Sequence, residues 1–324
     1  MARLQLITTP NESHGVAQCS VSYDELSVLL ENFLIAERHR ERVFRPRFQL
    51  RLDIASAWAI EAGSSILDIG CGHGESSVTL ALRLGPRARI AGIDTAVPEY
   101  GSPHTVAEAR DFILRTELGR QITFSRTDAE TMLAGQALGE ALPQFDAATL
   151  CLSLWYFPTR ASVESLFKTL AGASISSVYI AEYDLAASSR AQMPHVLAAR
   201  AQALLHTSKA VPRVADPREP NVRAALEVGE LRKAASEAGF EVVREGHLRP
   251  AQDMLEGHLE AQYVLSDAFE AAVRKENCAQ EEEILATVCT LRKAMEDLDE
   301  CGRKHAQAMD IWWAEMCVET EKIS

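Results

Sequence analysis

Apolar runs rich in isoleucine and valine alternate with helical stretches along the middle of the chain. Continuous apolar runs of this length are typical of strands buried on both faces, and helices between them connect parallel strands. A further helix and strand follow in VGELRKAASEAGFEVVREGHL, and residues 308–318 favour a last strand, with a helix nearly as well supported. The pattern predicts an α/β fold with a doubly wound, mostly parallel, seven-stranded sheet. Its first five strands are expected in SILDIG, RIAGID, QITFSRTD, FDAATLCLSL and SVYIAEYD.

The segments outside this alternation divide the chain. We expect a flexible tail, a pair of N-terminal helices, a core that carries a cap insertion at 185–222, a helical cap, and a last strand with a C-terminal tail. The corresponding ranges are 1–20, 21–63, 64–252, 253–307 and 308–324. Apolar residues recur at three- and four-residue steps within 253–300, which is typical of a helix packed on its own domain. They are Ile284, Val288, Leu291, Met295 and Leu298.

Charge and composition exclude several classes of protein. The 324 residues carry a formal net charge of -13, so phosphate backbones and anionic lipid would repel the chain. A basic stretch at 36–52 has its charges at helical spacing and is interpreted as a solvated helix face. No segment is apolar enough for a signal peptide or membrane span. We therefore expect neither a nucleic-acid nor a membrane partner, and we leave a homodimer open.

Cysteine and metal-ligand spacing give two further expectations. The seven cysteines include no C-x-x-C pair, which favours reduced thiols in a cytoplasmic protein over disulfides or a zinc site. No cluster of histidine, aspartate and glutamate has the spacing of a metal site. We expect no metal.

Three glycines at alternate positions, Gly70, Gly72 and Gly74, follow the first apolar run and precede a helix. Glycine allows backbone angles that other residues resist and removes side chains that would block a ligand. A dinucleotide fingerprint needs G-x-G-x-x-G, but Glu75 occupies the third glycine position. A carboxylate at a helix start would also repel a pyrophosphate. The turn therefore favours a ligand without phosphate.

Acids at the ends of the next two strands complete this pattern. Asp94 ends the second strand, where a carboxylate can accept hydrogen bonds from both hydroxyls of a ribose. Asp128 follows the third strand and can accept from an exocyclic amine. An adenosine with a cationic sulfonium and an amino acid tail suits all these features.

The order of ILDIGCGHG, AGIDTA, ITFSRTDAE and FDAATLCLSLWYF resembles the class I S-adenosylmethionine-dependent methyltransferases over roughly residues 50–250. The resemblance implies their Rossmann-like fold and S-adenosyl-L-methionine as cofactor. It also implies one set of residues around the methionine part and the sulfonium. Asp68 would help hold the amino group of the cofactor. The turn residues Gly70, Cys71 and Gly72 would lie against the methionine part, and Cys151 at the end of the fourth strand would flank the sulfonium.

The same resemblance implies contacts on the adenosine side. Asp94 would bind the ribose hydroxyls, and Asp128 with the backbone of Ala129 would meet the adenine. Thr95 is included among the adenosine-side residues, although its loop, DTAVPEYGSPHT, is long for this family.

The end of the fourth strand narrows the acceptor. Enzymes that methylate the amino groups of bases or of protein glutamine usually carry an Asn/Asp/Ser-Pro-Pro-Phe/Tyr element there, whereas this chain has LSLWYF. Trp155 and Tyr156 would offer a flat, rather apolar surface, and Tyr183 would orient the substrate. We therefore expect a small, fairly apolar acceptor.

In-line methyl transfer depends on alignment, so no catalytic residue is obligatory, and a base is needed only for a protonated nucleophile. The candidate bases are His195 and His206, eleven residues apart on one helix face, followed by Glu182 and Asp184.

The sequence thus predicts a methyltransferase of the natural-product type that acts on an oxygen or nitrogen atom of a small molecule. Two alternatives stay open. One is an enzyme that binds the cofactor but performs a cyclisation or rearrangement without transferring the methyl group. The other is a non-catalytic binding protein, which predicts an exposed apolar stripe at Ile284, Val288, Leu291 and Leu298.

Overall fold

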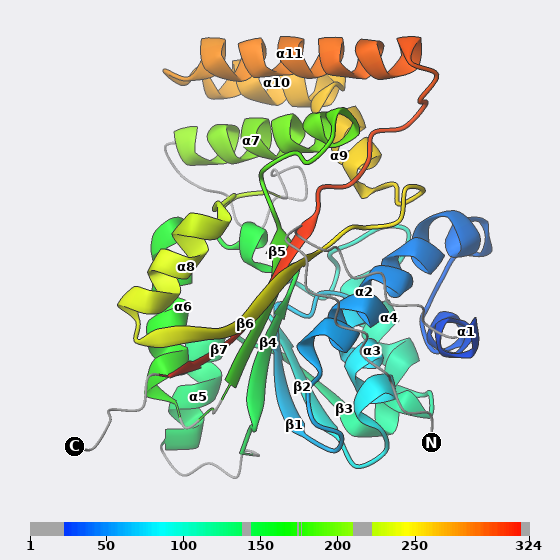
Figure 1. The fold of residues 1–324 in the computed structure, drawn as a ribbon, viewed down its shortest axis with the longest axis vertical. Coiled ribbons are helices and arrows are strands. Elements are labelled where there is room, and N and C mark those ends of the chain that lie inside the picture. The colour runs from blue at the N-terminus through cyan, green and yellow to red at the C-terminus, as the bar shows by residue number, and fades with distance from the viewer. Residues whose placement is uncertain (1–22, 138–143, 174, 176, 210–221, 319–324) are drawn as a thin grey trace, which may run out of the picture.

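The computed structural model describes residues 23–137, 144–173, 175, 177–209 and 222–318. Seven strands form one sheet in the order β3-β2-β1-β4-β5-β7-β6, and β7 runs antiparallel to both of its neighbours (Figure 1). This confirms the predicted α/β class, and residues 311–318 form a strand. The strands are β1 (Ser65–Ile69), β2 (Arg89–Asp94), β3 (Ile122–Arg126), β4 (Ala147–Cys151), β5 (Ser177–Tyr183), β6 (Phe240–Leu248) and β7 (Ile311–Val318).

The centre of the sheet contains the point where the strand order reverses. β1 pairs with β2 on one side and with β4 on the other, all in parallel. Connections therefore leave the carboxyl ends of β1 and β4 in opposite directions and open a crevice between them. The glycine turn follows β1, so it lies at this crevice.

Helices cover both faces of the sheet because successive strand residues point to opposite sides. Ile66 packs on the face that carries α1–α4, and Leu67 packs on the face that carries α5, α6 and α8. The first group is α1 (Tyr23–Glu31), α2 (Arg45–Trp58), α3 (Glu75–Leu84) and α4 (Val106–Leu114); the second is α5 (Ala129–Ala137), α6 (Arg160–Gly172) and α8 (Val228–Glu237). Short helical turns are η1 (Glu37–His39), η2 (Arg40–Phe44), η3 (Leu118–Gln121), η4 (Leu154–Tyr156) and η5 (Arg190–Gln192).

The N-terminal helices differ in their bounds from the sequence pattern. α2 starts at Arg45 and contains Pro46 in its first turn, where the missing N–H of proline removes no helical hydrogen bond. It ends at Trp58, because Ala59 takes a left-handed conformation with φ 51°, so it stops short of residue 63, the end of the predicted helical range. Residues 1–22 lie outside the described residues.

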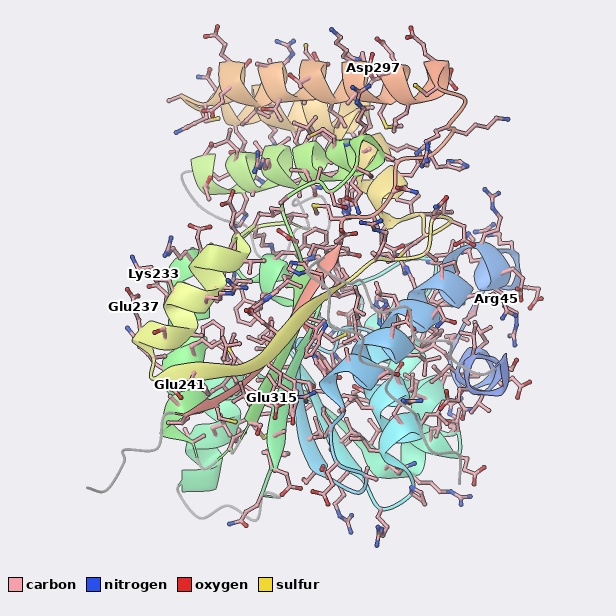
Figure 2. All side chains as sticks on the ribbon, in the orientation of Figure 1. Arg45, Lys233, Glu237, Glu241, Asp297 and Glu315 are labelled. Atoms are coloured by element: carbon pink, nitrogen blue, oxygen red, sulfur yellow. The ribbon has the colours of Figure 1, made fainter. Side chains whose placement is uncertain are left out.

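Four further helices form a cap above the edge of the sheet at which the strands other than β7 have their carboxyl ends (Figure 1). They are α7 (Met193–Ser208), α9 (Glu256–Val264), α10 (Asp267–Glu276) and α11 (Glu281–Glu300). Ile284, Val288 and Leu291 of α11 are buried against α7, α9 and α10, so they do not form an exposed stripe. Charged side chains such as Asp297 lie on α11, the cap helix farthest from the sheet (Figure 2). Residues 210–221 of the predicted cap insertion lie outside the described residues.

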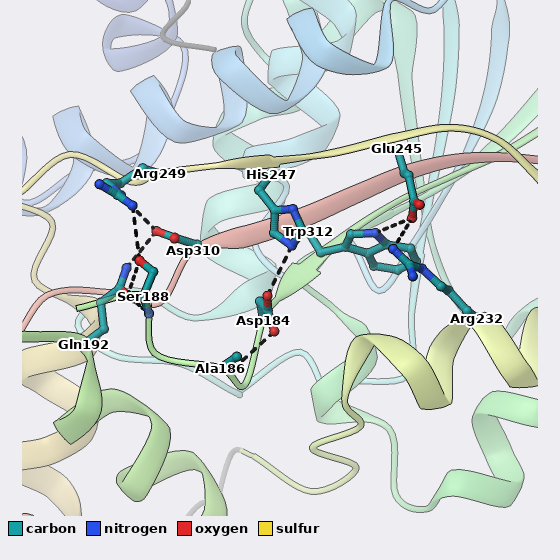
Figure 3. A network of polar contacts seen from close by, with 10 residues as sticks. All are labelled: Asp184, Ala186, Ser188, Gln192, Arg232, Glu245, His247, Arg249, Asp310 and Trp312. Carbon is teal, nitrogen blue, oxygen red and sulfur yellow. Dashed lines mark hydrogen bonds and ion pairs between the residues drawn. The ribbon is translucent and has the colours of Figure 1, made fainter. Parts of the chain in front are cut away.

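A polar network joins the cap to the strand ends (Figure 3). Asp310, just before β7, accepts hydrogen bonds from Gln192 at 2.7 Å and from Arg249 at 3.4 Å. The backbone N–H of Ser188 donates to the Gln192 carboxamide oxygen at 2.8 Å. Gln192, Arg249 and Asp310 lie on the three segments that connect the sheet with the cap, so these contacts join those segments to one another.

Candidate active site

The glycine turn leaves one open position. Gly70 and Gly72 have φ of +72° and +52°, a region that favours glycine. A Cβ on Gly70 would lie 2.6 Å from the Cβ of Ser153, so this glycine is required by packing. A Cβ on Gly72 would meet nothing within 4 Å. Gly72 is therefore the glycine whose bare backbone faces room for a ligand.

Asp68 lies beneath the turn and is fully buried. Its carboxylate accepts hydrogen bonds from Ser76 and Ser77 of α3 at 2.7 and 2.6 Å, and from Thr149 of β4 at 3.0 Å. Burial raises the pKa of this carboxyl despite the three hydroxyls. The contacts lock α3 and β4 under the turn, and the predicted role of Asp68 at the cofactor's amino group stays a prediction.

Asp94 lies beside the open glycine. Its Oδ2 accepts the backbone N–H of Gly72 at 2.8 Å, and its Oδ1 accepts that of Ala96 at 2.7 Å. Each carboxylate oxygen has a second lone pair, so both can still accept a hydroxyl. Thr95 is exposed, and its carbonyl accepts a hydrogen bond from Arg126 at 3.4 Å.

The end of β3 supplies the second acid. Asp128 is exposed, and its Oδ1 accepts the backbone N–H of Thr131 at 2.7 Å in the first turn of α5. Ala129 is buried next to it. β2 and β3 are paired in parallel up to Asp94 and Arg126, so both acids lie at one edge of the sheet.

Arg110 of α4 contacts the glycine turn, and the sequence pattern did not predict this contact. Its Nε donates to the carbonyl of Gly72 at 3.0 Å, and its guanidinium lies 3.5 Å from the sulfur of Cys71. Burial raises the pKa of the Cys71 thiol, so this cysteine stays neutral. A single arginine on a helix face carries no sequence signal for such a contact.

The end of β4 has an unusual backbone. Leu152 takes a left-handed conformation with φ 54°, which is rare for a bulky residue, and its N–H donates to the carbonyl of Ala181 at 2.8 Å. Cys151 is buried, and burial raises the pKa of its thiol to about 12. Strain of this kind clusters at functional sites and is held by surrounding contacts.

Glu182 supplies those contacts. Its Oε2 accepts the backbone N–H groups of Leu154 and Trp155 at 2.8 and 3.2 Å, and its Oε1 accepts that of Tyr183 at 2.9 Å. Burial raises the pKa of this carboxyl to about 7, against the effect of the three N–H groups. Glu182 was a candidate base, but its oxygens hold η4 against β5.

The aromatic residues predicted for the substrate come together. The ring centroid of Trp155 lies 4.5 Å from that of Tyr183, 5.6 Å from that of Tyr156 and 5.8 Å from that of His195. Trp155 and Tyr183 are each 4% exposed, whereas Tyr156 is 43% exposed. Tyr156 is therefore the ring that an acceptor can reach, and the other two support it.

The geometry disfavours the predicted base role of both histidines. His195 is fully buried, and its Nδ1 accepts the backbone N–H of Met309 at 3.0 Å, so the ring proton is on Nε2. Burial lowers the pKa of His195 to about 3, which leaves the ring neutral and without a free lone pair near pH 7. His206 is also buried, and its Nε2 lies 2.9 Å from the carbonyl of Pro158. His195 joins α7 to the segment before β7, and His206 joins α7 to the loop after η4.

Asp184 lies in the polar network at the strand ends (Figure 3). Its Oδ2 is 3.2 Å from Nε2 of His247, and its Oδ1 accepts the N–H of Ala186 at 3.2 Å. The structure therefore does not bring this candidate base into the aromatic cluster.

An ion-pair network links the glycine turn to the cap. Glu75, the first residue of α3, lies 2.5 Å from Arg51 and 3.7 Å from Arg47, and Arg47 also pairs with Glu256 of α9. Burial opposes ionisation of Glu75, but the charges of Arg51 and Arg47 outweigh it and lower the pKa of the carboxyl. Both arginines belong to the basic stretch at 36–52, which the sequence pattern predicted to be a solvated helix face. That prediction is wrong for these two residues, because only 28% of the Arg47 side chain and 13% of the Arg51 side chain are exposed.

These residues fit the amino acid end of S-adenosylmethionine. Nε of Arg51 is buried and has no hydrogen-bond partner among the described residues, so it can donate to a carboxylate. The open side of Gly72 and the free lone pairs of Asp94 accommodate the rest of a nucleoside.

The described part of the chain contains no group of three or more histidine, cysteine, aspartate or glutamate side chains that could hold a metal ion. No helix among the same residues is both long and apolar enough to span a bilayer.

A sheet of this order, with an open glycine turn and acids at two neighbouring strand ends, defines an α/β enzyme that binds a nucleoside at its switch point. A cyclopropane-fatty-acyl-phospholipid synthase-like protein from Lactobacillus casei has the same fold, with a TM-score of 0.73 and 22% identity over 91% of this chain and 100% of that one. Methyltransferase phomM from Diaporthe leptostromiformis is 44% identical, over 90% of this chain and 89% of that protein.

A third relative is more distant. Ubiquinone biosynthesis O-methyltransferase from Pseudomonas putida is 34% identical over 128 residues, which cover 38% of this chain and 48% of that enzyme. No family model matches the chain. The chain belongs to the class I S-adenosylmethionine-dependent methyltransferases, and S-adenosylmethionine is its cofactor.

Proposed function

We propose that the enzyme transfers the methyl group of S-adenosylmethionine to an oxygen or nitrogen atom of a small, fairly apolar acceptor. One observation carries the proposal. The open side of Gly72 and the exposed ring of Tyr156 follow the paired strands β1 and β4, at the edge of the sheet that the cap covers. A cofactor at the turn and a flat acceptor on Tyr156 would therefore be neighbours.

Separate groups would hold the cofactor along the crevice. Asp94 would accept the ribose hydroxyls, and Asp128 with the backbone of Ala129 would meet the adenine. The methionine part would lie beside the turn, against Gly70, Cys71 and Gly72, and Arg51 would donate to its carboxylate. Asp68 would support the amino group from beneath the turn. Cys151 would flank the sulfonium, and Thr95 would line the adenosine side.

The bound cofactor supplies an electrophilic methyl group. The protein's part is to align the acceptor with that methyl group, which lowers the barrier by replacing an encounter in solution with a fixed geometry. Tyr156 would support the acceptor, while Trp155, Tyr183 and His195 pack behind it and exclude water. His195 and His206 thus act in this proposal by positioning α7.

Composition and the cap support further proposals on location, partners and acceptor class. An acidic chain without a C-x-x-C pair supports a cytoplasmic location and a role without nucleic acid. The aromatic surface and the dedicated cap support a natural-product acceptor, and hence secondary metabolism. A homodimer stays open.

Product mass tests the proposal. The enzyme would be incubated with S-adenosylmethionine and a panel that includes phenol, 4-methoxyphenol, benzylamine and tyramine, then assayed by mass spectrometry. We expect S-adenosylhomocysteine and a product heavier by one methyl group. Tight cofactor binding with no transfer to any acceptor would contradict the proposal, as would a product of unchanged mass.

A further inference from the structure

Transfer of a methyl group to a hydroxyl or a protonated amine requires a group that takes the proton. The four candidate bases from the sequence are all engaged elsewhere. His195 and His206 hold α7, Glu182 holds η4, and Asp184 pairs with His247. A carboxylate on the cap, Glu260 of α9, has a different setting.

Glu260 is held by one partner on the neighbouring cap helix. Gln202 of α7 donates from its Nε2 to Oε2 of Glu260 at 2.6 Å. Among the described residues, no donor is bonded to Oε1 of Glu260, so this oxygen is available to an acceptor. Gln202 itself is fully buried, and its Oε1 has no hydrogen-bond partner in the same described part of the chain. A buried carboxamide oxygen without a hydrogen-bond partner is unfavourable, so it favours a ligand with an O–H or N–H group.

The charge of Glu260 acts on two tyrosines whose side chains are partly exposed. After burial, it is the strongest influence that raises the pKa of Tyr156 at the end of β4. Burial also raises the pKa of Tyr100, in the loop after β2, and Asp94 and Glu260 act in the same direction against Arg223. Tyr100 and Tyr156 are 39% and 43% exposed. Glu260 lies one helical turn after Glu256 on α9, and Glu256 pairs with Arg47, which also lies 3.7 Å from Glu75 at the start of α3. These contacts place Glu260 on the side of the cap that faces the glycine turn, in agreement with its effect on the two tyrosines.

The charges around Glu260 leave it as an available base. Burial and the neighbouring Glu256 raise the pKa of its carboxyl, while Gln202 and Arg47 lower it. Glu256, one turn earlier on α9, forms an ion pair with Arg47. A carboxylate whose pKa lies above its usual value accepts a proton more readily.

We propose that Glu260 is the catalytic base of the methyl transfer and that Gln202 is its positioning residue. This inference rests on the proposed function. The oxygen or nitrogen of the acceptor forms a bond to the methyl carbon, and the bond from that carbon to sulfur breaks with its electron pair left on sulfur. The acceptor's proton goes to Oε1 of Glu260, which later releases it to solvent. The acceptor class is a small aromatic alcohol or amine, with a second donor group for Oε1 of Gln202.

The test compares Glu260→Gln with Asp297→Asn, which removes one negative charge from the exposed surface of the same cap. With an acceptor from the panel above that turns over, we expect Glu260→Gln to lower kcat about 100-fold or more, with little change in KM or in the affinity for S-adenosylhomocysteine. Asp297→Asn should match the wild type, and Glu260→Asp should restore part of the rate. Thermal unfolding checks that each variant folds.

The pH profile separates catalysis from a structural role. The wild-type rate should rise with pH as Glu260 ionises, and Glu260→Gln should lack this rise. Gln202→Leu removes a hydrogen bond that lowers the pKa of Glu260, so the rise should move to higher pH. Activity of Glu260→Gln within threefold of the wild type, or an unmoved profile in Gln202→Leu, would overturn the inference alone. Absence of product with the wild type would instead overturn the proposed function, and this inference with it.

Discussion

The carboxylate of Asp94 accepts the backbone N–H of Gly72 at 2.8 Å, so the acid that ends β2 holds the turn glycine whose missing side chain opens room for a ligand. The two residues are 22 positions apart, and β1 and β2 are paired in parallel. This contact joins the two parts of the proposed cofactor site, the glycine turn and the end of β2.

Asp94→Ala should weaken cofactor binding. The variant loses two charge-assisted hydrogen bonds to the ribose, so we expect a loss of about 1–3 kcal/mol, or about 5- to 150-fold in Kd. Calorimetric titration with S-adenosylhomocysteine measures this loss. Asp111→Ala, at an exposed position of α4, is the control and should bind normally. Equal affinity in the two variants would remove Asp94 from the site.

Gly72→Ala should lose cofactor affinity by more than tenfold, because its Cβ would enter the open space beside Asp94. The left-handed backbone adds about 1–2 kcal/mol of strain in the folded protein. Gly239→Ala is a matched control, because Gly239 also has positive φ and a Cβ there meets nothing within 4 Å. Urea unfolding should show similar destabilisation of both variants, while titration should show a binding defect in Gly72→Ala only. A normal Kd for Gly72→Ala would contradict the site.

Glu182→Gln should change the pH dependence of stability. The folded state raises the pKa of Glu182 from 4.5 to about 7, so it binds more protons than the unfolded state between these values. The wild type therefore loses stability relative to the variant as pH rises from about 4.5 to 7, by at most about 3 kcal/mol. Urea unfolding at pH 5 and pH 8 measures the difference. Glu241→Gln, on the exposed part of β6, should show no such trend, and a flat difference for Glu182→Gln would argue against the raised pKa (Figure 2).

His195 should destabilise the folded protein in acid. Its pKa is lowered from 6.5 to about 3, so only the unfolded state gains a proton between these values. The contribution of the neutral ring is complete above pH 6.5 and is lost as pH falls, by at most about 3 kcal/mol down to pH 4.5. His195→Gln should lack this acid-dependent loss, whereas His305→Gln, at an exposed position, should keep it. An equal acid response of the wild type and His195→Gln would show that the ring titrates normally.

Local sequence patterns predicted much of the fold. Runs such as SILDIG and RIAGID predict buried strands because a strand signal depends on neighbouring residues. Gly72 marks a bare turn and Asp94 marks a strand end, and each of these is recognisable within a few positions. The class of cofactor follows from their order and spacing.

Only the tertiary structure decided where the cap lies and which protonation state each candidate base has. Arg47 and Glu256 are 209 positions apart in the sequence and pair only because the folded chain brings α2 and α9 together. His195 is an ordinary helix residue in the sequence, and it becomes a neutral, buried acceptor only beside Met309. Likewise, Glu260 gains its setting from Gln202, 58 positions away. The sequence by itself determined the sheet, the turn and the cofactor class. The protonation of each candidate base depended on contacts between distant segments of the chain. The reason is that burial and charge pairing arise only when the chain is packed.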